Sequence, residues 1–188
     1  MRRAVFLDRD GTIVEEAGYL DRLERLVFFP FSVDAVRVLN RAGFAVVVIT
    51  NQAGIARGMY TEEQFHELMV WMRAKLDREQ ADVDAVYYCA HHPVHGVGEY
   101  KRECDERKPG PGMLLRVAAE ELRLDLARSF VVGDRWHDVA AGHAVGARGL
   151  LVRTGLGRRD ETHPHPGTTP DAIVDNVMEA AAWILQQP

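Results

Sequence analysis

The chain has 188 residues, 47% apolar and 27% charged, so it can bury a full core, and we expect one domain over residues 1–188. Its formal charge of −5 argues against a nucleic-acid partner and requires that any bound anion be held by local cations or a metal. No apolar stretch is long enough to span a bilayer, and the N-terminus lacks a signal-peptide pattern, which argues against a membrane partner and predicts a cytoplasmic protein.

Short β-branched runs alternate with longer amphipathic segments along the chain. We predict strands at 4–7, 45–49, 85–88, 130–132 and 150–152, and a last short strand after a loop at 160–170. We predict helices at 32–43, 61–78, 111–122, 137–145 and 176–186. Ser32 is the expected N-cap of the first helix, and Thr61 with Gln64 matches a capping box. This alternation predicts an α/β fold, a Rossmann-like doubly wound parallel sheet with right-handed crossovers.

The first predicted strand ends in Asp8-Arg9-Asp10-Gly11, which places two carboxylates side by side at its carboxyl end. Ligands collect outside these ends in open α/β sheets, and two like charges this close need a cation or a proton between them. The pair therefore indicates a site that binds Mg²⁺ and attacks a phosphate. Taken alone, it also fits a surface turn with two solvated acids or a calcium loop.

Three later segments place polar groups at the same edge of the predicted sheet. Thr50-Asn51-Gln52-Ala53-Gly54 follows the second strand and offers a hydroxyl, an amide and loop N–H groups to phosphoryl oxygens. Arg107 and Lys108 precede a helix N-terminus, whose partial positive charge adds to theirs. Asp134 follows the fourth strand, and Asp138 lies one helical turn later. Each segment alone fits an ordinary cap, loop or turn, but together and in this order they predict a phosphoryl-transfer site.

These segments resemble the four motifs of the haloacid dehalogenase (HAD) phosphatase superfamily, namely Asp8-Arg9-Asp10-Gly11-Thr12, Thr50-Asn51, Lys108 and Gly133-Asp134-Arg135-Trp136-His137-Asp138. Three stretches look more narrowly like the D-glycero-D-manno-heptose 1,7-bisphosphate 7-phosphatases, namely the continuation Gly54-Ile55-Ala56-Arg57-Gly58 and the segments 89–93 and 104–109. Histidinol-phosphate phosphatases share much of this pattern but usually lack the stretch 54–58. The resemblance covers most of the chain and implies a HAD fold with a small flap, a zinc-type loop and no large cap domain.

The resemblance also implies a phosphoric monoester hydrolase in which Asp8 attacks phosphorus and forms an aspartyl phosphate. Asp10 would protonate the departing sugar oxygen and later deprotonate the water that hydrolyses the intermediate. Mg²⁺ would be held by Asp8, Asp134 and the main-chain carbonyl of Asp10, and it would neutralise charge between nucleophile and phosphate.

Other side chains receive roles around the phosphate and the sugar. Thr50, Asn51 and Lys108 would hold the phosphoryl oxygens, and Asp138 would orient Lys108. The segment 17–30 is too long for a minimal connection and would form the flap that closes over the site. The expected substrate contacts are Gly18, Tyr19, Gln52, Ala53, Arg57, Arg107 and Arg135. Of these, the last two would bind sugar hydroxyls or a second phosphate.

The two cysteines, Cys89 and Cys104, are too few for a disulfide framework. The resemblance implies that they frame a metal loop at about 89–108 with structural zinc held by Cys89, His91, Cys104 and Glu106. Relatives usually carry a cysteine in place of Glu106, and a carboxylate is a harder ligand, so we expect weaker binding. His92 or His95 could replace it as the fourth ligand. The alternative is a loop without metal that keeps a buried free cysteine.

The resulting hypothesis is a cytoplasmic, Mg²⁺-dependent enzyme of carbohydrate metabolism that acts on a small phosphorylated sugar. It would remove the 7-phosphate of D-glycero-D-manno-heptose 1,7-bisphosphate on the way to nucleotide-activated heptose, and we expect it to be a monomer. The alternatives are a histidinol-phosphate phosphatase, another small sugar-phosphate phosphatase, or, from a different class, a non-catalytic phosphosugar-binding module.

Overall fold

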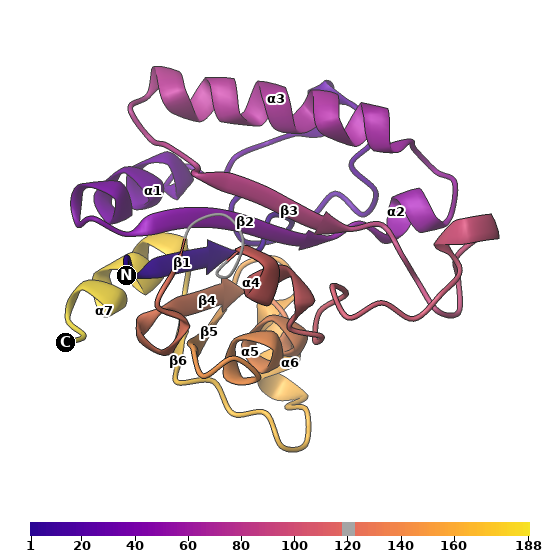
Figure 1. Ribbon diagram of the computed structural model, residues 1–188. Helices are drawn as coiled ribbons and strands as arrows, with labels where there is room; N and C mark the ends of the chain where they lie inside the picture. Colours follow the sequence, from indigo (N-terminus) through magenta and orange to yellow (C-terminus); the bar gives the residue numbers. More distant parts are fainter. Residues whose placement is uncertain (118–122) are drawn as a thin grey trace.

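The computed structural model describes residues 1–117 and 123–188, and its centre is one parallel sheet of six strands in the order β3-β2-β1-β4-β5-β6 (Figure 1). The strands are β1 (Ala4–Leu7), β2 (Ala45–Asn51), β3 (Ala85–Cys89), β4 (Phe130–Gly133), β5 (Arg148–Val152) and β6 (Ala172–Val174). The doubly wound α/β sheet that the sequence predicted is therefore confirmed. All residues of β1 and β4 are buried, which explains why these central strands are apolar without alternation.

Helices cover both faces of the sheet and leave its carboxyl edge open (Figure 1). On one face pack α1 (Ser32–Arg41), α3 (Glu62–Arg78) and α7 (Val177–Leu185), and on the other α4 (Gly112–Arg116) and α5 (Trp136–His143). Two short helices, α2 (Ala53–Ala56) and α6 (Gly157–Thr162), follow β2 and β5, and three 3-10 turns lie at Leu23–Arg25, Gly98–Tyr100 and Leu126–Arg128. None of the helices in the described ranges is both long and apolar enough to cross a membrane.

The strand order reverses at β1, which pairs with β2 on one side and β4 on the other. The main-chain N–H of Asp8 donates to the carbonyl oxygen of Val132 at 2.9 Å, so the ends of β1 and β4 remain tied beyond the last strand residue of β1. Crevices at such reversal points are where open α/β sheets bind ligands. The fold therefore sets the ends of β1, β2 and β4 around one crevice.

Two local features differ from the sequence expectations, and a third agrees with them. The N-cap of α1 is Phe31 rather than Ser32, because the buried Ser32 hydroxyl donates to the carbonyl oxygen of Ile13 at 2.7 Å instead of capping. The capping box at Thr61 is present. The start of the loop predicted at 160–170 is helical, because α6 extends to Thr162 although its polar sequence shows no apolar stripe. The predicted helix end near 122 lies outside the described residues.

Candidate active site

A pocket of about 190 Å³ lies at the carboxyl edge of the sheet, where the ends of β1, β2 and β4 meet the segment 17–30. Its lining includes most of the residues that the sequence placed there: Asp8, Asp10, Gly18, Tyr19, Thr50, Asn51, Gln52, Ala53, Arg107, Asp134 and Arg135. Arg57 is not part of the lining, and its guanidinium lies over the Tyr19 ring, 5.8 Å from the centroid. The tertiary structure thus brings four separated segments to one cavity.

Three carboxylates gather at the floor of this pocket and directly beneath it. Asp8 and Asp134 line the pocket, whereas Asp138 and Lys108 are buried and are not part of its lining. Oxygen atoms of Asp8, Asp134 and Asp138 all lie within 4.8 Å of one another, and all three residues are buried. Burial is the main reason that the pKa of Asp8 rises to about 7 and that of Asp134 to about 9, and repulsion between the carboxylates adds to both shifts. The protein therefore balances only part of the negative charge at this place. Uncompensated carboxylate charge of this kind favours the binding of a divalent cation.

Glycines make room for the Asp134 carboxylate. A Cβ atom added at Gly11 or Gly155 would lie 2.2 Å from Asp134 Oδ2, and both glycines have positive φ angles, +79° and +56°. Other residues rarely adopt this backbone conformation. The glycine that follows Asp10 in the first motif is thus required by the carboxylate that arrives from β4.

The ammonium group of Lys108 lies against two of these three carboxylates. Its Nζ atom lies 2.6 Å from Asp8 Oδ1 and 2.6 Å from Asp138 Oδ1, and it donates to the Ile49 carbonyl oxygen at 2.8 Å. Burial is the largest single influence and would raise the pKa of Asp138, but the Lys108 ammonium and His137 together outweigh it and the net pKa shift is downward. Asp138 therefore stays ionised, in the place where the sequence hypothesis needs a residue that orients Lys108.

The Asn51 side chain binds the main chain of Lys108. Its Nδ2 donates to the Lys108 carbonyl oxygen at 3.0 Å, and its Oδ1 accepts the Lys108 N–H at 3.0 Å. The Thr50 hydroxyl accepts a hydrogen bond from Gln52 at 2.7 Å and keeps its own proton to donate. Both side chains keep a donor for a phosphoryl oxygen, the Thr50 hydroxyl and the second Nδ2 hydrogen of Asn51, and both residues line the pocket. Asn51 in addition fixes the loop that carries Lys108.

Sequence reasoning gave no role to Arg9, Glu16 or Tyr60, and it predicted for Gln52 a contact with substrate rather than one with Asp10. Arg9 is 1% exposed and its guanidinium donates to the Asp10 carboxylate, with Nη2 to Oδ2 at 2.8 Å. Gln52 donates to the same oxygen at 3.1 Å, and the buried Tyr60 hydroxyl donates to Gln52 Oε1. Glu16 lines the pocket and accepts the Gly18 N–H at 2.7 Å. The position of Arg9 between two aspartates could have identified it as a partner of Asp10. No neighbouring sequence motif indicated that Glu16 or Tyr60 would lie near the site.

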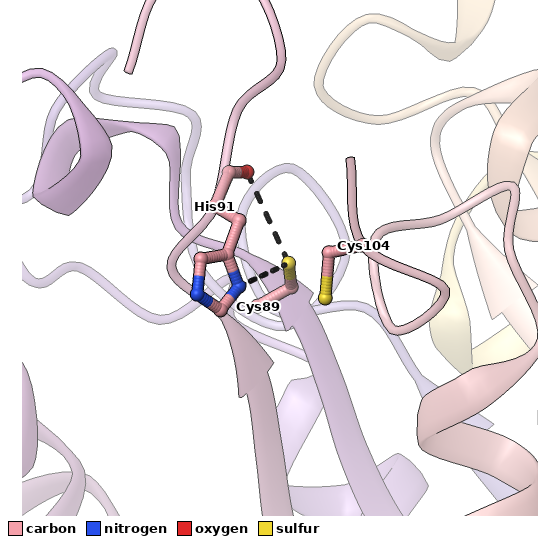
Figure 2. Close-up of side chains that lie close together, drawn as sticks. All are labelled: Cys89, His91 and Cys104. Carbon is pink, nitrogen blue, oxygen red and sulfur yellow. Dashed lines mark hydrogen bonds between the residues drawn. The ribbon is translucent and has the colours of Figure 1, made fainter. Parts of the chain in front are cut away.

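A second candidate metal group lies in the loop after β3. Figure 2 shows Cys89, His91 and Cys104 turned toward one another, with Cys89 Sγ 3.8 Å from His91 Nδ1 and the ligand atoms of all three within 4.8 Å. Burial raises the pKa of the Cys89 thiol to about 12, so this thiol stays protonated unless a cation binds. Two thiolates and an imidazole are ligands that Zn²⁺ prefers, and these three side chains fit it.

The fourth zinc ligand expected from the sequence does not join this group. The Glu106 carboxylate instead pairs with Arg116 of α4, at 2.5 Å between oxygen and nitrogen. His92 is also engaged, because its Nδ1 accepts the N–H groups of Val94 and His95 at 3.2 and 3.0 Å. The cluster in the described part of the chain is therefore a set of three ligands.

Comparisons with known proteins agree with this geometry. Residues 106–180 match the HAD-hydrolase-like family. The D-glycero-beta-D-manno-heptose-1,7-bisphosphate 7-phosphatase of Escherichia coli K12 is 49% identical over 184 residues, covering 97% of this chain and 87% of that protein. The Haemophilus influenzae protein of the same name is 43% identical over 178 residues, covering 93% and 95%.

Solved structures give the same result over nearly the whole length. The D,D-heptose 1,7-bisphosphate phosphatase from B. bronchiseptica, complexed with magnesium and phosphate, has a TM-score of 0.85 and 30% identity, covering 99% of both chains. A putative HAD-like phosphatase from Mesorhizobium loti has a TM-score of 0.82 and 37% identity, covering 97% of this chain and 86% of that one. The chain thus belongs to the D-glycero-D-manno-heptose 1,7-bisphosphate 7-phosphatase family of the HAD superfamily.

Proposed function

We propose that this protein is a Mg²⁺-dependent phosphatase that removes the 7-phosphate from D-glycero-D-manno-heptose 1,7-bisphosphate. The observation that carries the proposal is the pair Asp8 and Asp134 at the floor of a small pocket, with Lys108 and Asp138 buried against Asp8, in a chain 43–49% identical to phosphatases of that name. The pocket volume of about 190 Å³ suits a small phosphorylated sugar rather than a macromolecule. Function in the cytoplasm as a monomer remains a prediction from the sequence.

In the proposed reaction, Asp8 attacks phosphorus in line and the sugar oxygen departs with a proton from Asp10. The Asp10 carboxylate, held by Arg9 and Gln52, then takes a proton from the water that hydrolyses the aspartyl phosphate. Lys108, fixed by Asp138, places its positive charge beside the nucleophile and the transferring phosphate. Thr50 donates its hydroxyl proton to a phosphoryl oxygen.

Asp8 and Asp134, with the main-chain carbonyl of Asp10, are the groups that we expect to hold Mg²⁺. The bound cation supplies positive charge where an anionic nucleophile meets an anionic phosphate. The charges support this assignment, because Lys108 contacts only two of the three buried carboxylates, Asp8 and Asp138, among the described residues, and Asp134 has no such contact with it.

The direct test is steady-state phosphate release with Mg²⁺ from the α and β anomers of the heptose bisphosphate, with histidinol phosphate and fructose 1,6-bisphosphate as comparisons. We expect the highest kcat/KM for the β anomer, the form named in the E. coli and H. influenzae relatives. A preference for histidinol phosphate, or equally weak turnover of all four, would overturn the substrate assignment and leave the phosphatase chemistry in place.

The raised pKa values of Asp8 and Asp134 predict how stability depends on pH. A carboxyl whose pKa is higher in the folded than in the unfolded state binds more protons when folded, so the free energy of unfolding falls as pH rises. The fall begins above the unfolded value of about 4, passes through about 7 for Asp8 and is complete above about 9 for Asp134. We therefore expect the metal-free protein to have a lower Tm at pH 8.5 than at pH 6, by at least about 3 °C.

Mg²⁺ should remove part of this loss, because it binds the ionised carboxylates and competes with protons. Thermal unfolding at both pH values, with and without Mg²⁺, measures the effect, and the Mg²⁺-induced rise in Tm should be larger at pH 8.5. Asp134→Asn is the matched variant and should reduce both the pH dependence and the response to Mg²⁺. Equal Mg²⁺-induced shifts at the two pH values would contradict the assignment of these carboxylates.

We also propose that Cys89, His91 and Cys104 hold structural zinc with three protein ligands. Zinc measured by elemental analysis after purification without chelators should be close to one per chain and should fall to near zero in Cys104→Ser. Glu106→Gln should keep its zinc, because the Glu106 carboxylate pairs with Arg116. Glu106→Cys should slow zinc loss to a competing chelator, since a thiolate would complete the tetrahedron. Wild-type protein without zinc would contradict the proposal.

A further inference from the structure

Two carboxylates tie the turn after β4 to the segment after β5, and they do so in opposite directions. Asp134 Oδ2 accepts the Leu156 N–H at 2.7 Å, and Asp160 Oδ2 accepts the Trp136 N–H at 2.8 Å. Asp160 lies in the first turn of α6 and is only 8% exposed. The pocket wall that carries Asp134 is therefore held by a residue of α6 as well as by the sheet.

The same oxygen of Asp160 also binds Arg135. Arg135 Nε donates to Asp160 Oδ2 at 3.1 Å, which makes a charge-assisted contact on one side of the guanidinium. Elsewhere in residues 1–117 and 123–188, Nη1 and Nη2 of Arg135 have no hydrogen-bond or ion-pair partner, and Arg135 lines the pocket. A guanidinium held through Nε presents its two Nη groups as a fork that matches two oxygens of a phosphate.

The two other arginines that line the pocket are held by different groups. Arg9 is bound to the Asp10 carboxylate. Arg107 Nη1 donates to the His91 carbonyl oxygen at 3.1 Å, so its orientation depends on the metal loop and not on α6. Lys108 is occupied by Asp8 and Asp138 beneath the reacting phosphate. Arg135 is thus the pocket cation whose orientation α6 controls.

We propose that Asp160 is a positioning residue that holds Arg135 ready for the second phosphate of the substrate, an inference that rests on the proposed bisphosphatase function. Without Asp160, the long Arg135 side chain samples several rotamers, and the substrate must order it on binding. The entropic cost of ordering Arg135 therefore weakens binding of a bisphosphate. A sugar that carries only the reacting phosphate does not contact Arg135 in this way, and its binding is unchanged.

The test compares D-glycero-D-manno-heptose 1,7-bisphosphate with the corresponding 7-phosphate, which lacks the second phosphate. Asp160→Asn removes the negative charge and keeps an oxygen for the Trp136 N–H. We expect its KM for the bisphosphate to rise about tenfold, with kcat nearly unchanged, and its KM for the 7-phosphate to stay within about twofold. In an Arg135→Ala background, Asp160→Asn should not raise the KM for the bisphosphate any further relative to the KM for the 7-phosphate.

Glu161→Gln is the matched control, since Glu161 lies in the same helix and pairs with Arg153. It should leave both KM values unchanged. Partial unfolding of Asp160→Asn does not confuse the result, because both substrates meet the same folded fraction and the ratio of their kcat/KM values is independent of it.

The possible failures are distinguishable. If the wild-type enzyme prefers the bisphosphate and Asp160→Asn lowers kcat/KM for both substrates equally, Asp160 is a general structural residue and the positioning role is overturned. If the wild-type enzyme hydrolyses neither heptose phosphate, the proposed function fails and this inference fails with it.

Discussion

Asp8→Asn is expected to lower kcat by about 10⁵-fold, because the amide cannot attack phosphorus and no covalent intermediate can form. The substitution keeps the shape of the side chain beside Lys108, whose Nζ lies 2.6 Å from Asp8 in the wild type. Steady-state phosphate release measures the loss. Acid quenching of the wild-type reaction during turnover should trap a phosphoprotein that the variant does not form.

The thermal stability of Asp8→Asn distinguishes a loss of the nucleophile from misfolding. Burial raises the pKa of Asp8 to about 7, so the folded protein opposes ionisation of this carboxyl, and a neutral amide should not lower the Tm. Asp34→Asn on α1 is the control for the chemical change, since Asp34 is exposed and pairs with Arg37. The nucleophile assignment would be wrong if well-folded Asp8→Asn kept more than about one hundredth of the wild-type kcat.

Lys108→Met should cause the largest loss of stability among single substitutions in the pocket. It leaves two buried carboxylates, Asp8 and Asp138, without the ammonium that both contact at 2.6 Å. Removing one partner of a buried ion pair costs about 3–5 kcal/mol. For a chain of this length that corresponds to a fall in Tm of roughly 10 °C. Loss of the charge beside the phosphate should also lower kcat by about 10²–10³-fold.

A second substitution tests whether the loss comes from the unpaired charge. Lys108→Met combined with Asp138→Leu removes the most deeply buried carboxylate, so part of the Tm should return while activity stays low. Lys101→Met is the control, because Lys101 is exposed in the same loop. A Tm of Lys108→Met equal to that of the wild type would contradict the central role of this pairing.

The fold was predictable because its signals are local. Each central strand is a short run of buried apolar residues, and this pattern arises from burial on both faces of a parallel sheet. Alternation with helices then leaves few topologies, which is why the doubly wound sheet could be predicted without a structure. The short helix α6 was missed, because its residues are polar and its place depends on contacts with the turn after β4.

The candidate site was predictable in its residue types, since the acids and cations follow strand ends in the order that the resemblance requires. Of the pairings among those residues, the resemblance implied that of Asp138 with Lys108, but most of the others were not predictable. Asn51 binds the main chain of Lys108, 57 positions away, although its place after a strand only suggested a contact with phosphate. Glu106 pairs with Arg116, a residue that no metal-site pattern includes.

The sequence by itself therefore determined the sheet, the edge at which the site lies and the chemical groups that it contains, because strand periodicity and motif order are written in neighbouring residues. Apart from the pairing of Asp138 with Lys108, which the resemblance implied, only the tertiary structure decided which of these groups neutralise, orient or compete with one another. Lys108 lies between Asp8 and Asp138, and Asp160 lies beneath Arg135. Such pairings join segments far apart in the chain, and their electrostatic effects depend on burial and distance, which a linear pattern does not carry.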